Sequence, residues 1–201
     1  MLPVILVSNS PRRWKLIKQV VTDFQILKPD FPEILTSDDN PHDFVRKNAV
    51  GKNLSAPKCD LPLSYCLISS DTIVVWNNTI LGKPVDQEEA VRFLRSISGT
   101  RHEVLTGVSI RIFEKENQVH RYFYDLTTLL FQPLSDASIQ KYVHTKNPLD
   151  KAGAYGIQEI PSDWVQEIQG DLDNVVGLPV KQLKKELIWL SRYFELPILQ
   201  L

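Results

Sequence analysis

Residues 65–76 read YCLISSDTIVVW, an apolar run that one acidic residue, Asp71, interrupts. The apolar and β-branched residues on both sides predict a buried strand, with its regular part over Ile68–Trp76. Burying a carboxylate without a partner costs several kcal/mol or shifts its pKa. Asp71 must therefore be ion-paired, bound to a metal, or placed beside a water-filled cleft. This favours a functional role slightly over that of a structural aspartate that accepts backbone N–H groups.

Helices and strands alternate along the rest of the chain. Further strands are predicted over Pro3–Ser8, Phe24–Leu27, Thr79–Leu81, His102–Phe113, Val119–Leu130 and Trp164–Ile168. Four helix starts are predicted at the N-cap residues Ser10, Asn40, Asp86 and Ser135, and an apolar stripe predicts a last helix over Val180–Phe194. Asn77-Asn78 is typical of a hairpin turn, because asparagine tolerates positive φ. The order predicts an α/β fold with a mixed sheet flanked by helices.

The composition limits the class of protein. With 201 residues, 43% of them hydrophobic, the chain suits one or two compact units, and no linker divides it, so we expect a single domain over residues 1–201. Its 23 basic and 24 acidic residues give a net charge of −1, which disfavours nucleic acid and membrane surfaces as partners. Cys59 and Cys66 lack zinc-ligand spacing and indicate ordinary thiols. Since no signal peptide and no stretch of about 20 apolar residues is evident, we expect a cytoplasmic protein.

A first polar segment follows the first predicted strand and reads SNSPRR, from Ser8 to Arg13. Free backbone N–H groups at the start of a helix favour anions, and arginine offers bidentate geometry to phosphate. The residues Ser8, Arg12 and Arg13 thus indicate a phosphate-binding segment. A capped helix with two solvated arginines explains the same residues equally well.

Three further polar segments carry weaker signals. LGKP, residues 81–84, places Lys83 after a glycine at a strand end, although a surface turn explains it better. In LDKAGAYGIQ, residues 149–158, Tyr155 could stack on a ring and Gln158 could hydrogen-bond a base edge, or the run could be a long surface loop. NVVGLP, residues 174–179, is explained by the start of the last helix.

In their order and spacing, these segments resemble the Maf family of nucleoside triphosphate pyrophosphatases. The resemblance covers essentially the whole chain and rests on SNSPRR (8–13), SDTIVV (70–75), LGKP (81–84), SGTRHEVLTGV (98–108), PLDKAGAYGIQ (148–158) and NVVGLP (174–179). It implies hydrolysis of a nucleotide between its α- and β-phosphates to a monophosphate and pyrophosphate, in a house-cleaning role. It also implies an elongated, inosine-triphosphatase-like fold with two lobes around a cleft, a Mg²⁺ or Mn²⁺ cofactor, and in many members a homodimer.

The resemblance also assigns roles to residues of this chain. Asp71 corresponds to the proposed general base, and Glu33 to a carboxylate near the metal. The positions that mark the subgroup preferring dTTP and UTP are matched by Arg12, Thr72 and Gln158. Phosphate-contacting positions are matched by Ser8, Arg13, Lys52 and Lys83. The chain departs from the family at Glu159, where a glycine usually follows the glutamine, and this could change the shape of the base pocket.

Two alternatives remain open at this point. The same reaction could act on another base, for example on 7-methyl-GTP, or the protein could be a non-catalytic nucleotide-binding regulator of cell division. A panel of nucleotides, with pyrophosphate release measured for each, separates these alternatives. A DNA-binding patch is disfavoured by the balanced charge.

Overall fold

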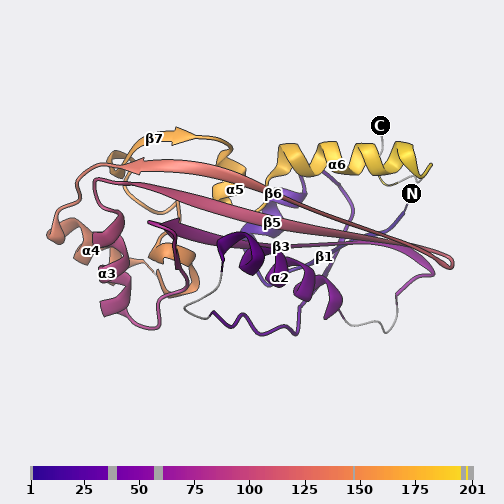
Figure 1. The fold of residues 1–201 in the computed structure, drawn as a ribbon, viewed down its shortest axis with the longest axis horizontal. Helices are drawn as coiled ribbons and strands as arrows, with labels where there is room; N and C mark the ends of the chain where they lie inside the picture. The colour runs from indigo at the N-terminus through magenta and orange to yellow at the C-terminus, as the bar shows by residue number, and fades with distance from the viewer. Residues whose placement is uncertain (1, 36–39, 57–60, 147, 196–197, 199–201) are drawn as a thin grey trace.

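A mixed sheet of seven strands runs along the protein (Figure 1). The computed structural model describes residues 2–35, 40–56, 61–146, 148–195 and 198. The strands are β1 (Val4–Val7), β2 (Gln25–Leu27), β3 (Ser64–Trp76), β4 (Thr79–Leu81), β5 (Arg101–Glu114), β6 (Asn117–Phe131) and β7 (Val165–Gln169). Their order is β2-β1-β3-β5-β6-β7, and β4 pairs with β3. The pairs β1–β2 and β1–β3 are parallel and the others antiparallel, which confirms the predicted α/β class and mixed sheet.

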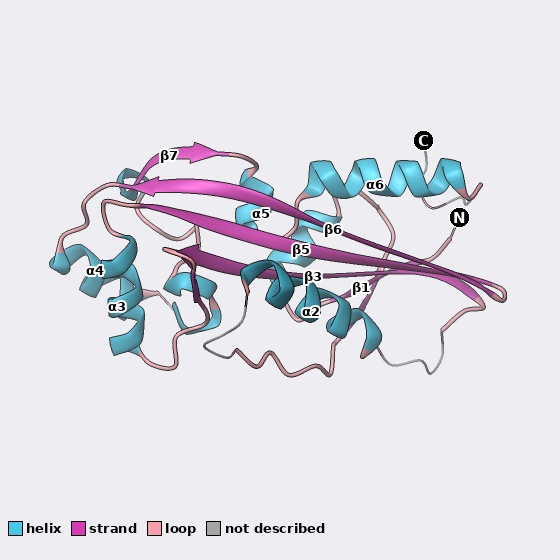
Figure 2. Ribbon diagram, viewed as in Figure 1, coloured by secondary structure: helices cyan, strands magenta, loops and turns pink. Residues whose placement is uncertain are grey.

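Helices cover both faces of this sheet. They are α1 (Pro11–Ile17), α2 (Pro41–Leu54), α3 (Gln87–Ile97), α4 (Asp136–Thr145), α5 (Leu172–Val176) and α6 (Val180–Tyr193), with short 3-10 helices η1 (Pro148–Asp150), η2 (Ala152–Ala154) and η3 (Ser162–Trp164). Figure 2 shows α2 and α6 on opposite sides of the long strands, with α3 and α4 together at one end of the elongated molecule. No helix in the described ranges is long and apolar enough to cross a membrane.

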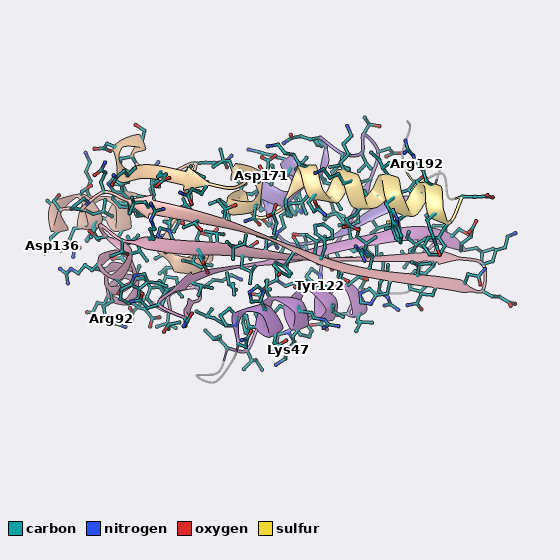
Figure 3. All side chains as sticks on the ribbon, turned by 45° about the horizontal axis from the view of Figure 1, so that its top comes forward. Lys47, Arg92, Tyr122, Asp136, Asp171 and Arg192 are labelled. Atoms are coloured by element: carbon teal, nitrogen blue, oxygen red, sulfur yellow. The ribbon has the colours of Figure 1, made fainter. Side chains whose placement is uncertain are left out.

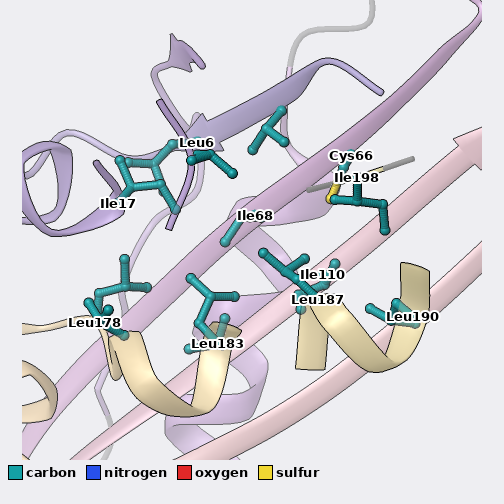
Figure 4. Close-up of a cluster of buried hydrophobic side chains, with 14 of the residues drawn as sticks. Leu6, Ile17, Cys66, Ile68, Ile110, Leu178, Leu183, Leu187, Leu190 and Ile198 are labelled. Carbon is teal, nitrogen blue, oxygen red and sulfur yellow. The ribbon is translucent and has the colours of Figure 1, made fainter. Parts of the chain in front are cut away.

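The two-residue period of β5 explains why a helix packs on each face. Val108, Ile110 and other alternate residues point into a core cluster with α1 and α6. Leu105, which points the other way, joins Phe44 and Val45 of α2. Figure 4 shows the first cluster, where leucines of α6 meet β1, β3 and β5 side chains. Each such buried leucine or isoleucine stabilises the fold by about 2 kcal/mol.

A second core cluster lies at the opposite end of the long strands. It joins α3 and α4 to the ends of β5 and β6 and includes Phe131, Tyr142 and Trp164. Strands β3, β5 and β6 contribute side chains to both clusters and so connect them. That residues 1–201 form a single domain stays a prediction.

Most predicted elements are present, with some differences at their ends. The turn Asn77-Asn78 is confirmed, with φ of 48° and 58°. β3 begins before Ile68, because its residues 66–69 pair with β1. The turn after β5 is shorter than predicted, since Lys115 adopts a positive φ of 54° and lets the strands extend.

Some structure was not predicted at all. Helix α5 was missed, because its five residues are too few to show a period, and so were the 3-10 helices of the loop. Cys66 is buried, and burial raises the pKa of its thiol to about 12, in keeping with an unreactive cysteine. Cys59 lies outside the described residues.

Candidate active site

A cavity of about 370 Å³ lies where the strand pairing of β3 is interrupted. β1 pairs with β3 as far as Ser69, and β4 pairs with it only from Val74. In the described chain, residues 70–73 therefore have one edge without a strand partner. Neighbouring strand residues point to opposite faces of a sheet. The gap explains how Asp71 and Thr72 can both line the same cavity.

The structure brings every predicted site residue to this cavity. They come from the turn after β1, α1, the loop before α2, α2 itself, β3, the turn after β4 and the loop after η2: Ser8, Arg12, Arg13, Glu33, Lys52, Asp71, Thr72, Lys83 and Gln158. Their individual roles stay predictions. Only the tertiary structure brings them together, because Ser8 and Gln158 lie 150 positions apart in the sequence.

Asp71 is buried, with 4% of its surface exposed, and both of its oxygens have partners. Oδ1 accepts from Lys52 Nζ at 2.5 Å, and Oδ2 accepts from Asn48 Nδ2 at 2.9 Å. Lys52 Nζ also lies 2.5 Å from Glu33 Oε1, and Lys83 Nζ lies 2.7 Å from Glu33 Oε2. The buried carboxylate of Asp71 is thus ion-paired, as the sequence allowed, and its partner Lys52 also pairs with Glu33.

Helix α2 positions this cluster through the spacing of its residues. Asn48 and Lys52 are four residues apart and so lie on one face of the helix, beside β3. Next to Lys52, Gly51 has no side chain, and the ring of Phe31 occupies that space, since a Cβ there would lie 2.2 Å from the ring. This packing brings the segment that carries Glu33 against α2.

Asn48 was missed in the sequence, although a signal was available. Its stripe on α2 begins with the buried Phe44 and continues with polar residues that are also buried. A polar continuation of an apolar stripe indicates a partner on the facing strand. The oxygen Asn48 Oδ1 has no hydrogen-bond partner within the described chain and belongs to the same buried region.

The charges around Glu33 hold it in its ionised form. Burial alone would raise its pKa, but Lys52 and then Lys83 outweigh this effect and lower the pKa of Glu33 to about 2. For Arg13, burial lowers the pKa because it disfavours the charged guanidinium, although the negative charges of Asp71 and Glu33 act in the opposite direction. Arginine nevertheless stays protonated in proteins. The cavity therefore contains fixed charges of both signs.

On the other face of β3, Arg13 and Thr72 are tied together. Arg13 donates through Nη2 to Thr72 Oγ1 at 2.9 Å and through Nε to the Gly177 carbonyl at 2.8 Å. Thr72 Oγ1 also lies 2.9 Å from Thr106 Oγ1. Gly177 has a φ of 124°, and a Cβ there would lie 3.3 Å from Arg13 Nε. The glycine of the NVVGLP segment thus brings its backbone to the site, beyond starting the last helix.

The start of α1 is built as predicted. Ser10 caps the helix through its side chain, Pro11 occupies its first turn, and the buried Ser8 accepts a hydrogen bond from the Ser10 N–H at 3.1 Å. This arrangement turns the chain sharply after β1 and directs Arg12 and Arg13 to the cavity.

A second ionic cluster lies on the cavity wall formed by residues 148–160. Lys151, with 5% of its side chain exposed, has Nζ 2.6 Å from Asp150 Oδ1 and 3.2 Å from Glu159 Oε2. The other Asp150 oxygen, Oδ2, lies 3.3 Å from Arg12 Nη1. None of the three loop residues was singled out as a site residue, because an irregular loop has no period that would show which side chains point inward.

Tyr155 anchors the same loop. It is buried in the second core cluster, and its hydroxyl lies 2.8 Å from His102 Nε2. Burial lowers the pKa of His102 to about 4, so the imidazole is neutral near pH 7. The loop is therefore held to the sheet rather than lying loosely on the surface.

The donor set fits a divalent cation that a substrate helps to bind. Oxygens of Glu33 and Asp71 converge on one cationic nitrogen, Lys52 Nζ. No group of three or more His, Cys, Asp or Glu residues suited to a metal occurs in the described ranges. Mg²⁺ commonly uses one or two carboxylates and takes its other ligands from water and phosphate.

The chain is similar to curated proteins over most of its length. A dTTP/UTP pyrophosphatase of Bacillus cereus (strain B4264) is 40% identical over 184 residues, which cover 92% of this chain and 93% of that protein. A dTTP/UTP pyrophosphatase of Clostridium botulinum (strain Okra / Type B1) is 41% identical over 187 residues, covering 92% of this chain and 95% of that protein.

Solved structures support the fold. A HAM1 protein from Coxiella burnetii matches with a TM-score of 0.53 at 14% identity, over 94% of this chain and 100% of that one. The Ham1 protein of Staphylococcus aureus matches with a TM-score of 0.50 at 12% identity, over 96% of this chain and 99% of that one. These matches confirm the predicted inosine-triphosphatase-like fold. The Maf-like protein family model matches residues 3–189, and with the relatives above it shows that this chain belongs to the Maf family.

Proposed function

We propose that this protein hydrolyses nucleoside triphosphates between the α- and β-phosphates, with dTTP and UTP as preferred substrates. The observation that carries the proposal is the meeting of four cationic side chains with a buried carboxylate in one cavity: Arg12, Arg13, Lys52 and Lys83 around Asp71. A polyanionic triphosphate needs such local cations, because the net charge of the chain is −1. The relatives named dTTP/UTP pyrophosphatase support the choice of base.

In this proposal Asp71 accepts the proton of an attacking water. Lys52 and Asn48 occupy two of the roughly four lone-pair positions of its carboxylate, so acceptor capacity remains for a water in the cavity. Attack on the phosphoryl group breaks the α–β anhydride bond and releases pyrophosphate and the monophosphate. Arg13, Lys83 and Ser8 would bind phosphate oxygens, and positioning of this kind provides much of the catalysis of phosphoryl transfer.

We assign Asp71 and Glu33 as the protein ligands of a Mg²⁺ or Mn²⁺ ion. When bound, such an ion neutralises charge on the leaving pyrophosphate. Thr72, Arg12 and Gln158 would contact the pyrimidine. Thr72 would do so from the β3 edge, and Gln158 from the opposite loop.

A substrate panel tests the proposal. Pyrophosphate release from dTTP, UTP, CTP, GTP and 7-methyl-GTP should be measured with Mg²⁺, with Mn²⁺ and with a chelator. Release that is greatest for dTTP and UTP and lost with the chelator is expected. Preference for a purine nucleotide would overturn the assignment of base, and binding without release would favour a non-catalytic regulator.

A homodimer and a cytoplasmic location stay predictions. The molar mass in solution, measured by light scattering, tests the first against the 23.0 kDa of one chain. Fractionation of cells tests the second.

A further inference from the structure

Lys151 is a buried cation on the cavity wall that the proposed mechanism leaves without a role. Only 5% of its side chain is exposed, and its ammonium group lies between Asp150 and Glu159. A buried ammonium ion is costly unless carboxylates compensate it. Compensated charges of this kind can set a specific local geometry even where they add little stability.

The loop around Lys151 is shaped to its side chain. A Cβ on Gly156 would lie 2.9 Å from Lys151 Cε, so the backbone at Gly156 approaches the lysine stem closely. From there the chain turns, with the N–H groups of Glu159 and Ile160 donating to the Gly156 carbonyl at 2.8 and 3.1 Å. This turn carries Gln158, so the position of Gln158 depends on the contact between Gly156 and Lys151.

The ionic contacts of Lys151 extend in two directions. Through Asp150 they reach Arg12 at the start of α1, since one Asp150 oxygen contacts Lys151 and the other contacts Arg12. Through Glu159 they reach the residue next to Gln158. Burial would raise the pKa of Asp150, but Lys151 and Arg12 lower it, which keeps this bridging group ionised.

We propose that Lys151 is a positioning residue for base recognition, which holds Arg12 and the Gln158 turn at a fixed separation across the cavity wall. The proposal rests on the proposed function, in which Arg12 and Gln158 contact the pyrimidine. Glu159 supplies the second carboxylate of the cluster.

UTP and CTP provide a readout that isolates the base. They share the ribose and the triphosphate and differ only at one edge of the base, where uracil has a C4 carbonyl acceptor and an N3–H donor and cytosine has a C4 amino donor and an N3 acceptor. A general loss of folding or of phosphate binding lowers kcat/KM for both substrates alike. A shift in the relative position of Arg12 and Gln158 changes the ratio of the two values.

The main experiment compares Lys151→Met with wild type in pyrophosphate release from UTP and CTP. Methionine keeps the unbranched stem beside Gly156 and removes the charge. We expect the UTP-to-CTP ratio of kcat/KM to fall by at least about tenfold, mainly through a higher KM for UTP. Lys141→Met, an exposed lysine of α4 outside the cavity, is the matched control and should leave the ratio unchanged.

A ratio for Lys151→Met within twofold of wild type overturns the proposal, even if both rates fall. Glu159→Gln removes one ionic contact of Lys151, and Asp150→Asn removes the contacts of Asp150 with both Lys151 and Arg12. Each of the two variants should lower the ratio by a smaller factor than Lys151→Met. If Lys151→Met does not fold, these two variants decide, and unchanged ratios in both overturn the proposal.

Failure of the proposed function is recognised separately, from wild type alone. If wild type binds UTP but releases no pyrophosphate from any nucleotide, the proposed hydrolysis is wrong. The role of Lys151 is then tested by the UTP-to-CTP ratio of binding affinities, measured by calorimetry for each variant. A wild-type protein that binds neither nucleotide overturns both proposals.

Discussion

Two lysines line the same cavity, and each lies between two carboxylates. Lys52 contacts Asp71 and Glu33, whereas Lys151 contacts Asp150 and Glu159. Both lysine side chains are almost fully buried, at 6% and 5% exposed. The clusters differ in one carboxylate partner, because Asp71 is as buried as Lys52, while the side chain of Asp150 is 50% exposed. The other two partners, Glu33 and Glu159, are similarly exposed, at 31% and 34%.

The surroundings of the two clusters differ as well. Lys52 and Asp71 stand on a regular helix and a regular strand, α2 and β3, that pack closely together. Lys151 and its partners belong to a loop of 3-10 turns. A pair of opposite charges that is buried between two rigid elements suits chemistry that needs exact placement. Charges on a loop with solvated partners suit recognition of a variable part of the substrate.

The largest difference is expected when the buried carboxylate itself is changed. Asp71→Asn keeps the shape and the contact with Lys52 but removes the proton acceptor, so pyrophosphate release should fall by about 10²–10⁴-fold. Nucleotide affinity, measured by calorimetry, should change little. Asp136→Asn, at an exposed position of α4 labelled in Figure 3, serves as control. Near-normal turnover of Asp71→Asn would show that Asp71 is not the base.

The second prediction compares the two lysines in stability. Lys52→Met leaves buried Asp71 with Asn48 as its hydrogen-bond donor, and should lower the free energy of unfolding by about 3–5 kcal/mol. Lys151→Met leaves carboxylates that water can reach, so its cost should be about 1 kcal/mol. Chemical denaturation of both variants measures the difference. Equal losses of unfolding free energy in the two variants would mean that the exposure of the carboxylate partners does not determine how much each lysine stabilises the fold.

A third prediction uses pH to examine the Lys52 cluster alone. The pKa of Glu33 is about 2 in the folded protein, below its ordinary value of 4.5. Between these two pH values the unfolded chain binds more protons at Glu33 than the folded protein does. The ionised Glu33 therefore stabilises the folded protein fully above about pH 5, and this stabilisation is lost as the pH falls toward 2. Glu33→Gln lacks the contribution at every pH.

Unfolding by urea at pH 5 and pH 3 measures this effect. The stability difference between wild type and Glu33→Gln should be larger at pH 5 than at pH 3. Glu116→Gln, on the exposed turn between β5 and β6, should show no such change. If the stability difference between wild type and Glu33→Gln is the same at both pH values, Lys52 and Lys83 do not stabilise the Glu33 carboxylate.

The smallest effect on stability is expected at Lys83. Its side chain is 53% exposed, and its ion pair with Glu33 should contribute at most about 1 kcal/mol. Lys83→Met should therefore melt close to wild type, while KM for UTP rises because a phosphate contact is lost. A melting temperature as low as that of Lys52→Met would indicate that Lys83 mainly stabilises the fold through its ion pair with Glu33 and does not mainly bind substrate.

The Lys52 cluster was partly predictable from sequence, and the Lys151 cluster was not. Asp71 could be singled out because a charge inside an apolar strand is anomalous wherever the strand packs. Lys52 and Glu33 were reached only through the family resemblance, since a lysine on a helix and a glutamate in a loop are ordinary. Asn48 escaped notice, although the stripe on α2 pointed to it.

Residues of the loop after α4 show where sequence reasoning stops. The motif from Asp150 to Gln158 indicated a ligand, but the inward position of Lys151 follows from the close approach of Gly156. The contact of Glu159 with Lys151 follows from the turn that Gly156 closes. Such positions depend on φ values and on neighbours distant in sequence, and neither has a periodic signal.

The sequence by itself determined the elements of this protein. Periods of two and of about 3.6 residues, N-cap residues and the Asn77-Asn78 turn define most strands and helices, because these signals act between near neighbours. The tertiary structure decided where the elements meet. Asp71 and Thr72 point to opposite faces of β3, and they share a cavity only because β1 ends before them and β4 begins after them. That gap arises from strand pairing between distant segments, so no local pattern in the chain could contain it.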